Sequence, residues 1–159
     1  MVVWTNNILM EKSPRVNNSE KDILLAEDDA DDVDIFRSAL DKLQLSYELR
    51  HAENGDQLFI LLEEKIPYIL FLDIYMPCKD GVACILEIRK NRRYDKLPVI
   101  MYSSFFQEKY IDQSFRAGAN YYMTKPTSFM DLVAKMKMIL SIDWKNYLHY
   151  PNQDDFLIN

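Results

Sequence analysis

Short apolar runs recur along the chain from about residue 21, and polar or turn-forming residues bound each of them. The five runs are Ile23–Ala26, Tyr47–His51, Tyr68–Leu72, Val99–Tyr102 and Asn120–Met123. They are too short for helices, and several are rich in β-branched or aromatic residues, as is typical of buried strands. The pattern therefore predicts five β-strands.

The segments between these runs carry apolar residues at helical spacing. One such stripe comprises Val33, Phe36, Leu40 and Leu43, and the clearest comprises Phe129, Leu132, Val133, Met136, Ile139 and Leu140. Asp29 is a suitable N-cap for the first of these helices. Strands that alternate with helices indicate βαβ units and a parallel sheet covered on both faces. We predict an α/β fold of the flavodoxin-like, doubly wound type, with a five-stranded parallel sheet in the order 2-1-3-4-5 and five helices.

The two ends of the chain differ from its middle. Residues 1–20 are polar and aperiodic and are predicted to be a flexible leader, residues 21–150 a single domain, and residues 151–159 a short loose tail. The last helix is predicted to run past Ser141 through Trp144 and Leu148 and to stop before Pro151.

Charge and composition narrow the classes of partner. The net charge of −6 argues against direct binding of nucleic acid, which needs a basic face. No apolar stretch approaches the roughly 20 residues that span a bilayer, and the first residues lack the layout of a secretory signal. Cys78 and Cys84 lack metal-ligand spacing and are interpreted as buried or half-buried packing residues. Free thiols favour a reducing compartment, so we expect a cytoplasmic protein.

Polar residues follow several predicted strands at the point where each strand ends. Glu27 and Asp28 follow the first run, Asp73 follows the third, Ser103 follows the fourth, and Lys125 comes shortly after the fifth. Because the carboxyl ends of parallel strands share one edge of the sheet, these groups are expected to converge on one pocket. Carboxylates suit Mg²⁺, an aspartate can be a nucleophile, and a lysine offsets charge on a transferring group. The pattern favours a magnesium-assisted phosphoryl-transfer site.

Each of these residues also has a purely structural interpretation. An acidic residue after a strand is often a solvated loop residue or a helix cap, and this is the interpretation for Asp31, Asp32 and Asp34. Taken alone, Ser103 would be a turn hydroxyl and Lys125 a surface lysine. Their shared position at one end of the sheet favours the functional interpretation. The two histidines, His51 and His149, are interpreted as ordinary surface or loop residues.

These motifs, in this order, resemble the receiver domain of two-component response regulators from about Lys21 to about Tyr150. The matching segments are Ile-Leu-Leu-Ala-Glu27-Asp28-Asp29, Leu72-Asp73-Ile-Tyr-Met76-Pro77 with Asp80-Gly81, Ser103-Ser104, Gly118-Ala119 and Lys125-Pro126. The acidic stretch after the first strand and the long last helix with its Trp144 resemble the stand-alone receivers often linked to phytochrome-type or hybrid kinases.

The resemblance implies a role for each matched residue. Asp73 would take a phosphoryl group from a histidine kinase or a histidine phosphotransfer protein. Asp28 and Asp73 would bind Mg²⁺ directly, Glu27 would act through water, and the backbone carbonyl of Tyr75 would complete the protein ligands. It further implies that Ser103 and Lys125 contact the phosphoryl oxygens.

The resemblance also implies a switch and a backbone feature. Tyr122 occupies the aromatic position that turns inward when the hydroxyl residue, here Ser103, moves toward the phosphoryl group. The peptide bond between Lys125 and Pro126 is cis in the family.

Some residues depart from the family pattern. Ser103 stands where threonine is commoner. Tyr75 and Phe105 occupy positions whose side chains tune the attack of water on the acyl phosphate, and two aromatic rings there predict slow self-dephosphorylation. The aromatic residues around the fourth predicted helix are either core residues or a surface for partners or dimerisation; they are Phe105, Phe106, Tyr110, Phe115 and Tyr121.

Other functions fit the sequence less well. Phosphatases of the haloacid dehalogenase type need a second aspartate two residues after the nucleophile, where Tyr75 stands. A nucleotide- or flavin-binding domain needs a glycine-rich first turn, and this turn is anionic. The remaining alternative is a receiver fold that works as a phosphorylation-independent docking or dimerisation module. We expect a regulator that signals through protein contacts with an unknown downstream protein, with a homodimer as one candidate assembly, and that is not an enzyme beyond self-catalysed phosphotransfer and hydrolysis.

Overall fold

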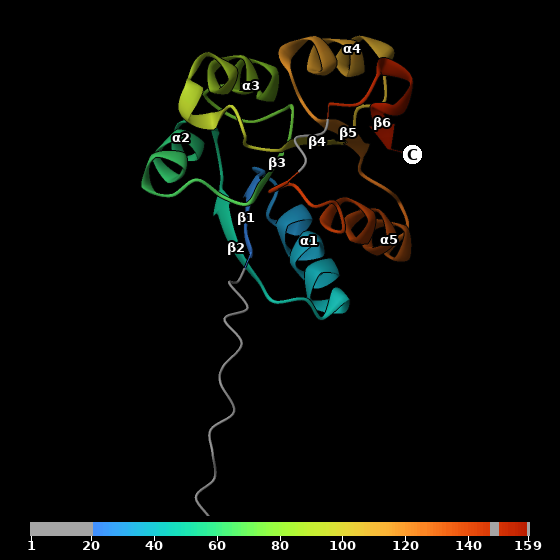
Figure 1. Ribbon diagram of the computed structural model, residues 1–159. Coiled ribbons are helices and arrows are strands. Elements are labelled where there is room, and N and C mark those ends of the chain that lie inside the picture. Colours follow the sequence, from blue (N-terminus) through green and yellow to red (C-terminus); the bar gives the residue numbers. More distant parts are fainter. Residues whose placement is uncertain (1–20, 147–149, 159) are drawn as a thin grey trace, which may run out of the picture.

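A parallel β-sheet forms the centre of the protein in the computed structural model, which describes residues 21–146 and 150–158 (Figure 1). The strands are β1 (Lys21–Ala26), β2 (Tyr47–Ala52), β3 (Ile69–Leu72), β4 (Val99–Ser103), β5 (Tyr121–Thr124) and β6 (Leu157–Ile158). Their order across the sheet is β2-β1-β3-β4-β5-β6, and each neighbouring pair is parallel. The first five strands confirm the predicted doubly wound order.

Helices cover both faces of this sheet. They are α1 (Ala30–Leu43), α2 (Gly55–Glu64), α3 (Gly81–Lys90), α4 (Glu108–Ala117) and α5 (Phe129–Leu140). Figure 1 shows α2, α3 and α4 on one side of the sheet and α1 and α5 on the other. Each central strand is buried on both faces, which explains why the strands appear in the sequence as nearly continuous apolar runs.

The two faces of the sheet contribute alternate residues to two separate cores. In β1, Leu24 and Ala26 pack in the core beneath α2, α3 and α4, whereas Ile23 and Leu25 pack in the core beneath α1 and α5. This alternation follows from the two-residue period of a strand. Both cores consist of buried hydrophobic residues, so the register of the strands is fixed and their carboxyl ends lie at fixed positions.

Side-chain caps fix where the helices begin. Asp29 caps α1 as predicted, and its Oδ1 accepts hydrogen bonds from the backbone N–H groups of Asp31 and Asp32 at 2.9 and 3.3 Å. Asp80 caps α3 in the same way, accepting from Ala83 N at 2.8 Å. Because caps satisfy otherwise unpaired N–H groups, they hold the first turns close to the strand ends.

Helix α5 is shorter than predicted. It ends at Leu140, and the chain then turns, so that Trp144 folds back against the helix instead of extending it. The Trp144 indole is buried and donates a hydrogen bond from Nε1 to the carbonyl oxygen of Ile139 at 3.0 Å. Trp144 is apolar because it is buried against the end of α5, and not because it belongs to the helix. The prediction that the helix continues to this residue is wrong.

The described residues after Pro151, 152–158, pack on the domain and do not form the loose tail that was predicted for residues 151–159. β6 adds a sixth strand to the edge of β5, with Tyr122 opposite Leu157 in the register. Phe156, just before β6, is fully buried, and its carbonyl oxygen accepts a hydrogen bond from Tyr122 N at 2.9 Å. A two-residue strand gives too little periodicity to be recognised in the sequence.

Some predictions concern residues outside the described part of the chain. Residues 1–20, His149 and Leu148 are among them, so the leader and the domain boundaries stay predictions. In the described part, Cys84 is buried as predicted, whereas Cys78 is exposed, which corrects the prediction for that residue. None of the described helices combines the length and the apolar character that a bilayer span requires.

Candidate functional site

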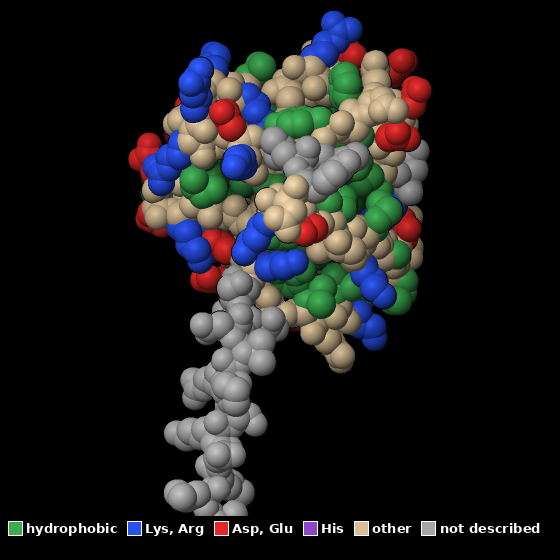
Figure 2. Space-filling model, in the orientation of Figure 1, with side chains coloured by type: hydrophobic (Ala, Val, Ile, Leu, Met, Phe, Trp, Pro, Cys, Tyr) green, Lys and Arg blue, Asp and Glu red, His purple; other side chains and the backbone are tan. Residues whose placement is uncertain are grey.

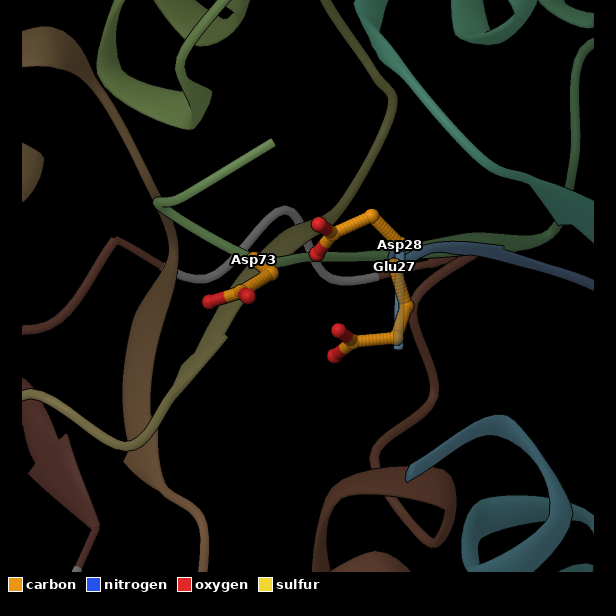
Figure 3. Close-up of side chains that lie close together, drawn as sticks. All are labelled: Glu27, Asp28 and Asp73. Atoms are coloured by element: carbon orange, nitrogen blue, oxygen red, sulfur yellow. The ribbon is translucent and has the colours of Figure 1, made fainter. Parts of the chain in front are cut away.

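Three carboxylates meet at the carboxyl end of the sheet. Glu27 and Asp28 directly follow β1, Asp73 directly follows β3, and these two strands are neighbours with Ala26 opposite Leu72. One oxygen from each of the three carboxylates lies within 4.8 Å of the others. Figure 3 shows the carboxyl group of Asp28 pointing toward Asp73, with that of Glu27 on the same side of the β1 end. The structure thus confirms the prediction that these three side chains lie close together.

The backbone around Asp73 is supported by the start of α3. Gly81 N donates to the carbonyl oxygen of Ile74 at 2.7 Å, and a Cβ atom at Gly81 would lie only 2.1 Å from the carbonyl oxygen of Asp73. A side chain at this position is therefore excluded by backbone atoms, which explains the glycine. Ile74 N also donates to Asp73 Oδ1 at 2.7 Å, so the carboxylate is oriented by its own loop.

Lys125 reaches into the same cluster from the end of β5. Its Nζ lies 2.5 Å from Glu27 Oε2, 2.6 Å from Asp32 Oδ2 and 3.6 Å from Asp73 Oδ2. The Lys125 side chain is 10% exposed and that of Glu27 is 1% exposed, so this ion pair is largely removed from water. A buried charge of this kind is stable only with close partners of opposite sign.

Burial dominates the electrostatics of the cluster. It raises the pKa of Glu27 to about 7, although the hydrogen bond from Lys125 acts in the opposite direction. Burial also raises the pKa of Asp73, while the charge of Lys125 and the Ser103 hydroxyl lower it. For Lys125, burial alone would lower the pKa, but the carboxylates of Asp73, Asp32 and Glu27 together raise it. Burial therefore favours the protonated form of the Glu27 and Asp73 carboxyls, and a cation bound beside them would act in the opposite direction.

The donor set fits a hard divalent cation. Every candidate ligand in the cluster is a carboxylate oxygen, the kind of ligand that Mg²⁺ prefers, and no thiol or imidazole belongs to the cluster. Asp28 is exposed, whereas Glu27 and Asp73 are buried, so the cluster opens to solvent on the Asp28 side. A cation could keep water ligands on that side, and a phosphoryl donor could approach from it.

Ser103 and Tyr122 lie on the neighbouring strands β4 and β5, two positions apart in the register. Ser103 is fully buried at the end of β4, and its carbonyl oxygen accepts from Lys125 N at 2.8 Å. Tyr122 is also fully buried, so its ring faces inward, and its hydroxyl donates to the carbonyl oxygen of Phe105 at 2.5 Å. Phe105 N in turn donates to Ser103 Oγ at 3.4 Å. The hydroxyl residue and the aromatic residue are therefore linked through one loop residue.

Three aromatic side chains contact one another on the loops that follow β3 and β4 and on α4. The rings of Tyr75 and Phe105 have centroids 4.5 Å apart, and Phe105 and Tyr110 have centroids 5.3 Å apart. The hydroxyls of Tyr75 and Tyr110 lie 2.8 Å from each other. These three residues, which we term the aromatic cluster, tie the loops after β3 and β4 to the first turn of α4. The Tyr75 carbonyl remains a predicted ligand.

The other aromatic residues of this region divide between the surface and packed positions. Phe106 is 75% exposed. Phe115 packs edge-on against Phe156 with centroids 5.2 Å apart, and Tyr121 packs against Trp144 with centroids 6.2 Å apart. Most of the set therefore contributes to packing, and Phe106 alone in the set is strongly exposed.

Two residues at the site were missed in the sequence. Asp32, interpreted as a solvated residue, contacts Lys125. His51, interpreted as an ordinary surface residue, donates from Nε2 to the carbonyl oxygen of Glu27 at 2.7 Å. The parallel register of β1 and β2 could have placed His51 near this end of the sheet, whereas the contact of Asp32 depends on where the Lys125 side chain points.

The peptide bond between Lys125 and Pro126 differs from the expectation that the resemblance gave. The described peptide bonds include no cis bond, so the expected cis bond is corrected.

Comparison with known protein sequences identifies one matching family and several relatives. A family profile described as the response regulator receiver domain matches residues 23–137. A 14.6 kDa protein of Leptolyngbya boryana, named for the sodA1 3′ region, is 30% identical over 115 residues, which are 72% of this chain and 86% of that protein. The phosphate regulon transcriptional regulatory protein PhoB of Pseudomonas aeruginosa is 29% identical over 120 residues, which are 76% of this chain but 52% of PhoB.

Solved structures with this fold include two regulators that are similar to the chain at 26% identity. The phosphorylated cyanobacterial phytochrome response regulator RcpA has a TM-score of 0.71, covering 76% of this chain and 91% of its own. The Mn²⁺-bound form of response regulator Rcp1 has a TM-score of 0.70, covering 82% of this chain and 99% of its own. The phosphoryl group and the manganese ion are properties of those two structures.

Proposed function

The chain belongs to the response regulator receiver domain family, and we propose that Asp73 accepts a phosphoryl group in a magnesium-dependent reaction. The observation that carries this proposal is the convergence of Glu27, Asp28 and Asp73 beside Lys125. An oxygen of the Asp73 carboxylate attacks the phosphorus of a phosphohistidine or a small phosphodonor. The bond from phosphorus to the donor breaks and the donor keeps that electron pair: a histidine takes up a proton, whereas acetyl phosphate leaves as acetate, and an acyl phosphate forms on Asp73.

The other residues of the site are proposed to bind the cation or to contact the phosphoryl group. Asp28 and Asp73 would hold Mg²⁺ directly, and Glu27 would hold it through water; when bound, the ion offsets charge on the carboxylates and the phosphoryl oxygens. Lys125, whose Nζ lies 3.6 Å from Asp73 Oδ2, supplies a second positive charge to the transferred group. Ser103, buried at the end of β4, supplies a hydroxyl donor to another phosphoryl oxygen.

The donor and the output are both proposed to be proteins. Receiver domains suggest a histidine kinase or a histidine phosphotransfer protein as the donor, and the exposed Asp28 side of the cluster leaves room for it. Figure 2 shows acidic and basic side chains interspersed on one face, without the continuous basic surface that a phosphate backbone requires. We therefore propose an output through contacts with a downstream protein.

Intact mass after incubation with acetyl phosphate and Mg²⁺ tests the acceptor. The wild type should gain one phosphoryl group, and Asp73→Asn should gain none, because an amide is a poor nucleophile. Asp34→Asn, which changes an exposed aspartate on α1, is the matched control and should behave as the wild type. A folded wild type that gains no phosphoryl group would contradict the proposal and leave a phosphorylation-independent docking module.

A further inference from the structure

Asp32 contacts the lysine of the site without belonging to its carboxylate cluster. Its Oδ2 lies 2.6 Å from Lys125 Nζ, almost the same as the 2.5 Å between that nitrogen and Glu27 Oε2. The clustered carboxylates of the described residues are those of Glu27, Asp28 and Asp73, and Asp32 is not among them. Asp32 is therefore placed to form an ion pair with the lysine rather than to bind a cation.

Glu27 has two possible partners at this site. Its Oε2 contacts the Lys125 ammonium, and its carboxylate is also part of the cluster that suits a divalent cation. An ammonium and a divalent cation repel each other, so a carboxylate that serves the cation loses part of its attraction for the lysine. Lys125 is only 10% exposed and needs another carboxylate partner when this happens.

The first turn of α1 holds Asp32 in place for this contact. Asp32 N donates to Asp29 Oδ1 at 3.3 Å, so the N-cap that begins the helix also fixes the backbone of Asp32. The Asp32 side chain is 32% exposed, and it therefore bears a smaller desolvation cost than Glu27 at 1%. Asp32 is thus the less costly site for a carboxylate that pairs with the lysine.

We propose that Asp32 is a positioning residue for Lys125: it holds the ammonium beside Asp73 and thereby leaves Glu27 available to the divalent cation. This inference rests on the proposed magnesium site and deepens it. Loss of the Asp32 carboxylate leaves Lys125 dependent on Glu27 and Asp73, where the ammonium competes with Mg²⁺. Asp32 therefore strengthens cation binding through the lysine, beyond the general effect of its negative charge.

Asp31 is a matched control for this proposal. It is the neighbouring aspartate in the same first turn of α1, it is exposed, and Asp31→Asn removes the same charge from the same end of the helix as Asp32→Asn. Both variants lose the same favourable interaction with the helix dipole. The ion pairs of Lys125 involve Glu27, Asp32 and Asp73, so any difference between the two variants isolates the lysine contact.

Nuclear magnetic resonance on the full chain can test the proposal with two readouts. The first is the hydrogen-exchange rate of the Lys125 ammonium without metal, which should rise several-fold in Asp32→Asn and stay unchanged in Asp31→Asn. The second is Mg²⁺ affinity from amide shifts, which should fall about fivefold in Asp32→Asn and less than about twofold in Asp31→Asn. Amide spectra of each variant also verify the fold.

A double-mutant cycle assigns the effect to the lysine. With Lys125→Met as the background, the two asparagine variants should change Mg²⁺ affinity by the same amount. Equal affinities of Asp32→Asn and Asp31→Asn in the wild-type background would overturn the proposal, and so would a difference that persists without Lys125. A wild type that binds no Mg²⁺ would overturn both the proposed magnesium site and the role of Asp32 in it. The exchange rates of the Lys125 ammonium test the contact between Asp32 and Lys125 independently of Mg²⁺ binding.

Discussion

The two halves of the site are built from different kinds of residue. The charged half, from β1, α1 and the loop after β5, consists of carboxylates and one lysine at ion-pair distances, including Lys125 Nζ at 2.5 Å from Glu27 Oε2. The aromatic half, from the loops after β3 and β4 and the start of α4, consists of rings in contact, including Tyr75 and Phe105 at 4.5 Å. Asp73 lies where the two halves meet.

This difference separates two tasks. The charged half offers ligands for a cation and a counter-charge for the phosphoryl group, so it should control how fast Asp73 is phosphorylated. The aromatic half contributes no side chain to the described carboxylate cluster; it follows the acceptor strand through Tyr75 and is hydrogen-bonded to Tyr122 through Phe105, so we expect it to control water access and the transmitted signal. Substitutions in each half should therefore change different rates.

The largest expected effect is in the charged half. Lys125→Met should slow phosphorylation of Asp73 by acetyl phosphate about 100-fold, because one preorganised charge is lost from the transition state. The initial rate of mass gain measures this. Lys135→Met is a matched control, since the Lys135 side chain is 9% exposed and pairs with Asp131 on α5, away from the site. A loss of similar size in Lys135→Met would show that burial of a lysine, not its position, is what matters.

The next effect concerns the protonation of Glu27. Burial raises the pKa of this carboxyl to about 7, so in the cation-free protein a proton competes with Mg²⁺ below that pH. Because Glu27 must lose its proton to serve the cation, Mg²⁺ affinity should rise by up to about tenfold per pH unit as the pH increases to 7 and then level off. Calorimetric titration from pH 5.5 to 8.5 measures this, and Glu27→Gln should remove most of the dependence.

The smallest effect is expected in the aromatic half. Tyr75→Asn should shorten the lifetime of phosphorylated Asp73 about fivefold, because the ring that covers Phe105 no longer excludes water. The same substitution should change the phosphorylation rate less than twofold, which would sharpen the contrast with Lys125→Met. Mass spectra over time after removal of the phosphodonor measure the lifetime. An equal or longer lifetime in Tyr75→Asn would show that the aromatic cluster does not protect the acyl phosphate.

The features predicted from sequence share one physical basis. Buried strands need apolar residues on both faces, so β1, β3 and β4 were visible as runs, and the parallel sheet then placed Asp28, Asp73 and Lys125 at one edge. The features that were missed depend on tertiary contacts. The pairing of β6 rests on a short apolar segment that gains stability only against β5, and the end of α5 rests on Trp144 folding back.

The missed contacts at the site have a similar origin. A lysine side chain can reach several carboxylates, and its partner is decided by burial and by which acid is free. The sequence therefore predicted that Lys125 faces the acidic pocket but not that it contacts Asp32. Helix capping by Asp29 was predictable because it depends on residues only a few positions apart.

The most direct test of the charged half is the dependence of the phosphorylation rate on Mg²⁺ concentration in the wild type and in Asp28→Asn. The wild type should show no phosphorylation with a chelator and a saturable rise with Mg²⁺. Asp28→Asn should need at least about tenfold more Mg²⁺ for half of its maximal rate, because a ligand is lost. A wild-type rate that is unchanged by the chelator, or the same Mg²⁺ dependence in both proteins, would contradict the assignment of these carboxylates to a cation site.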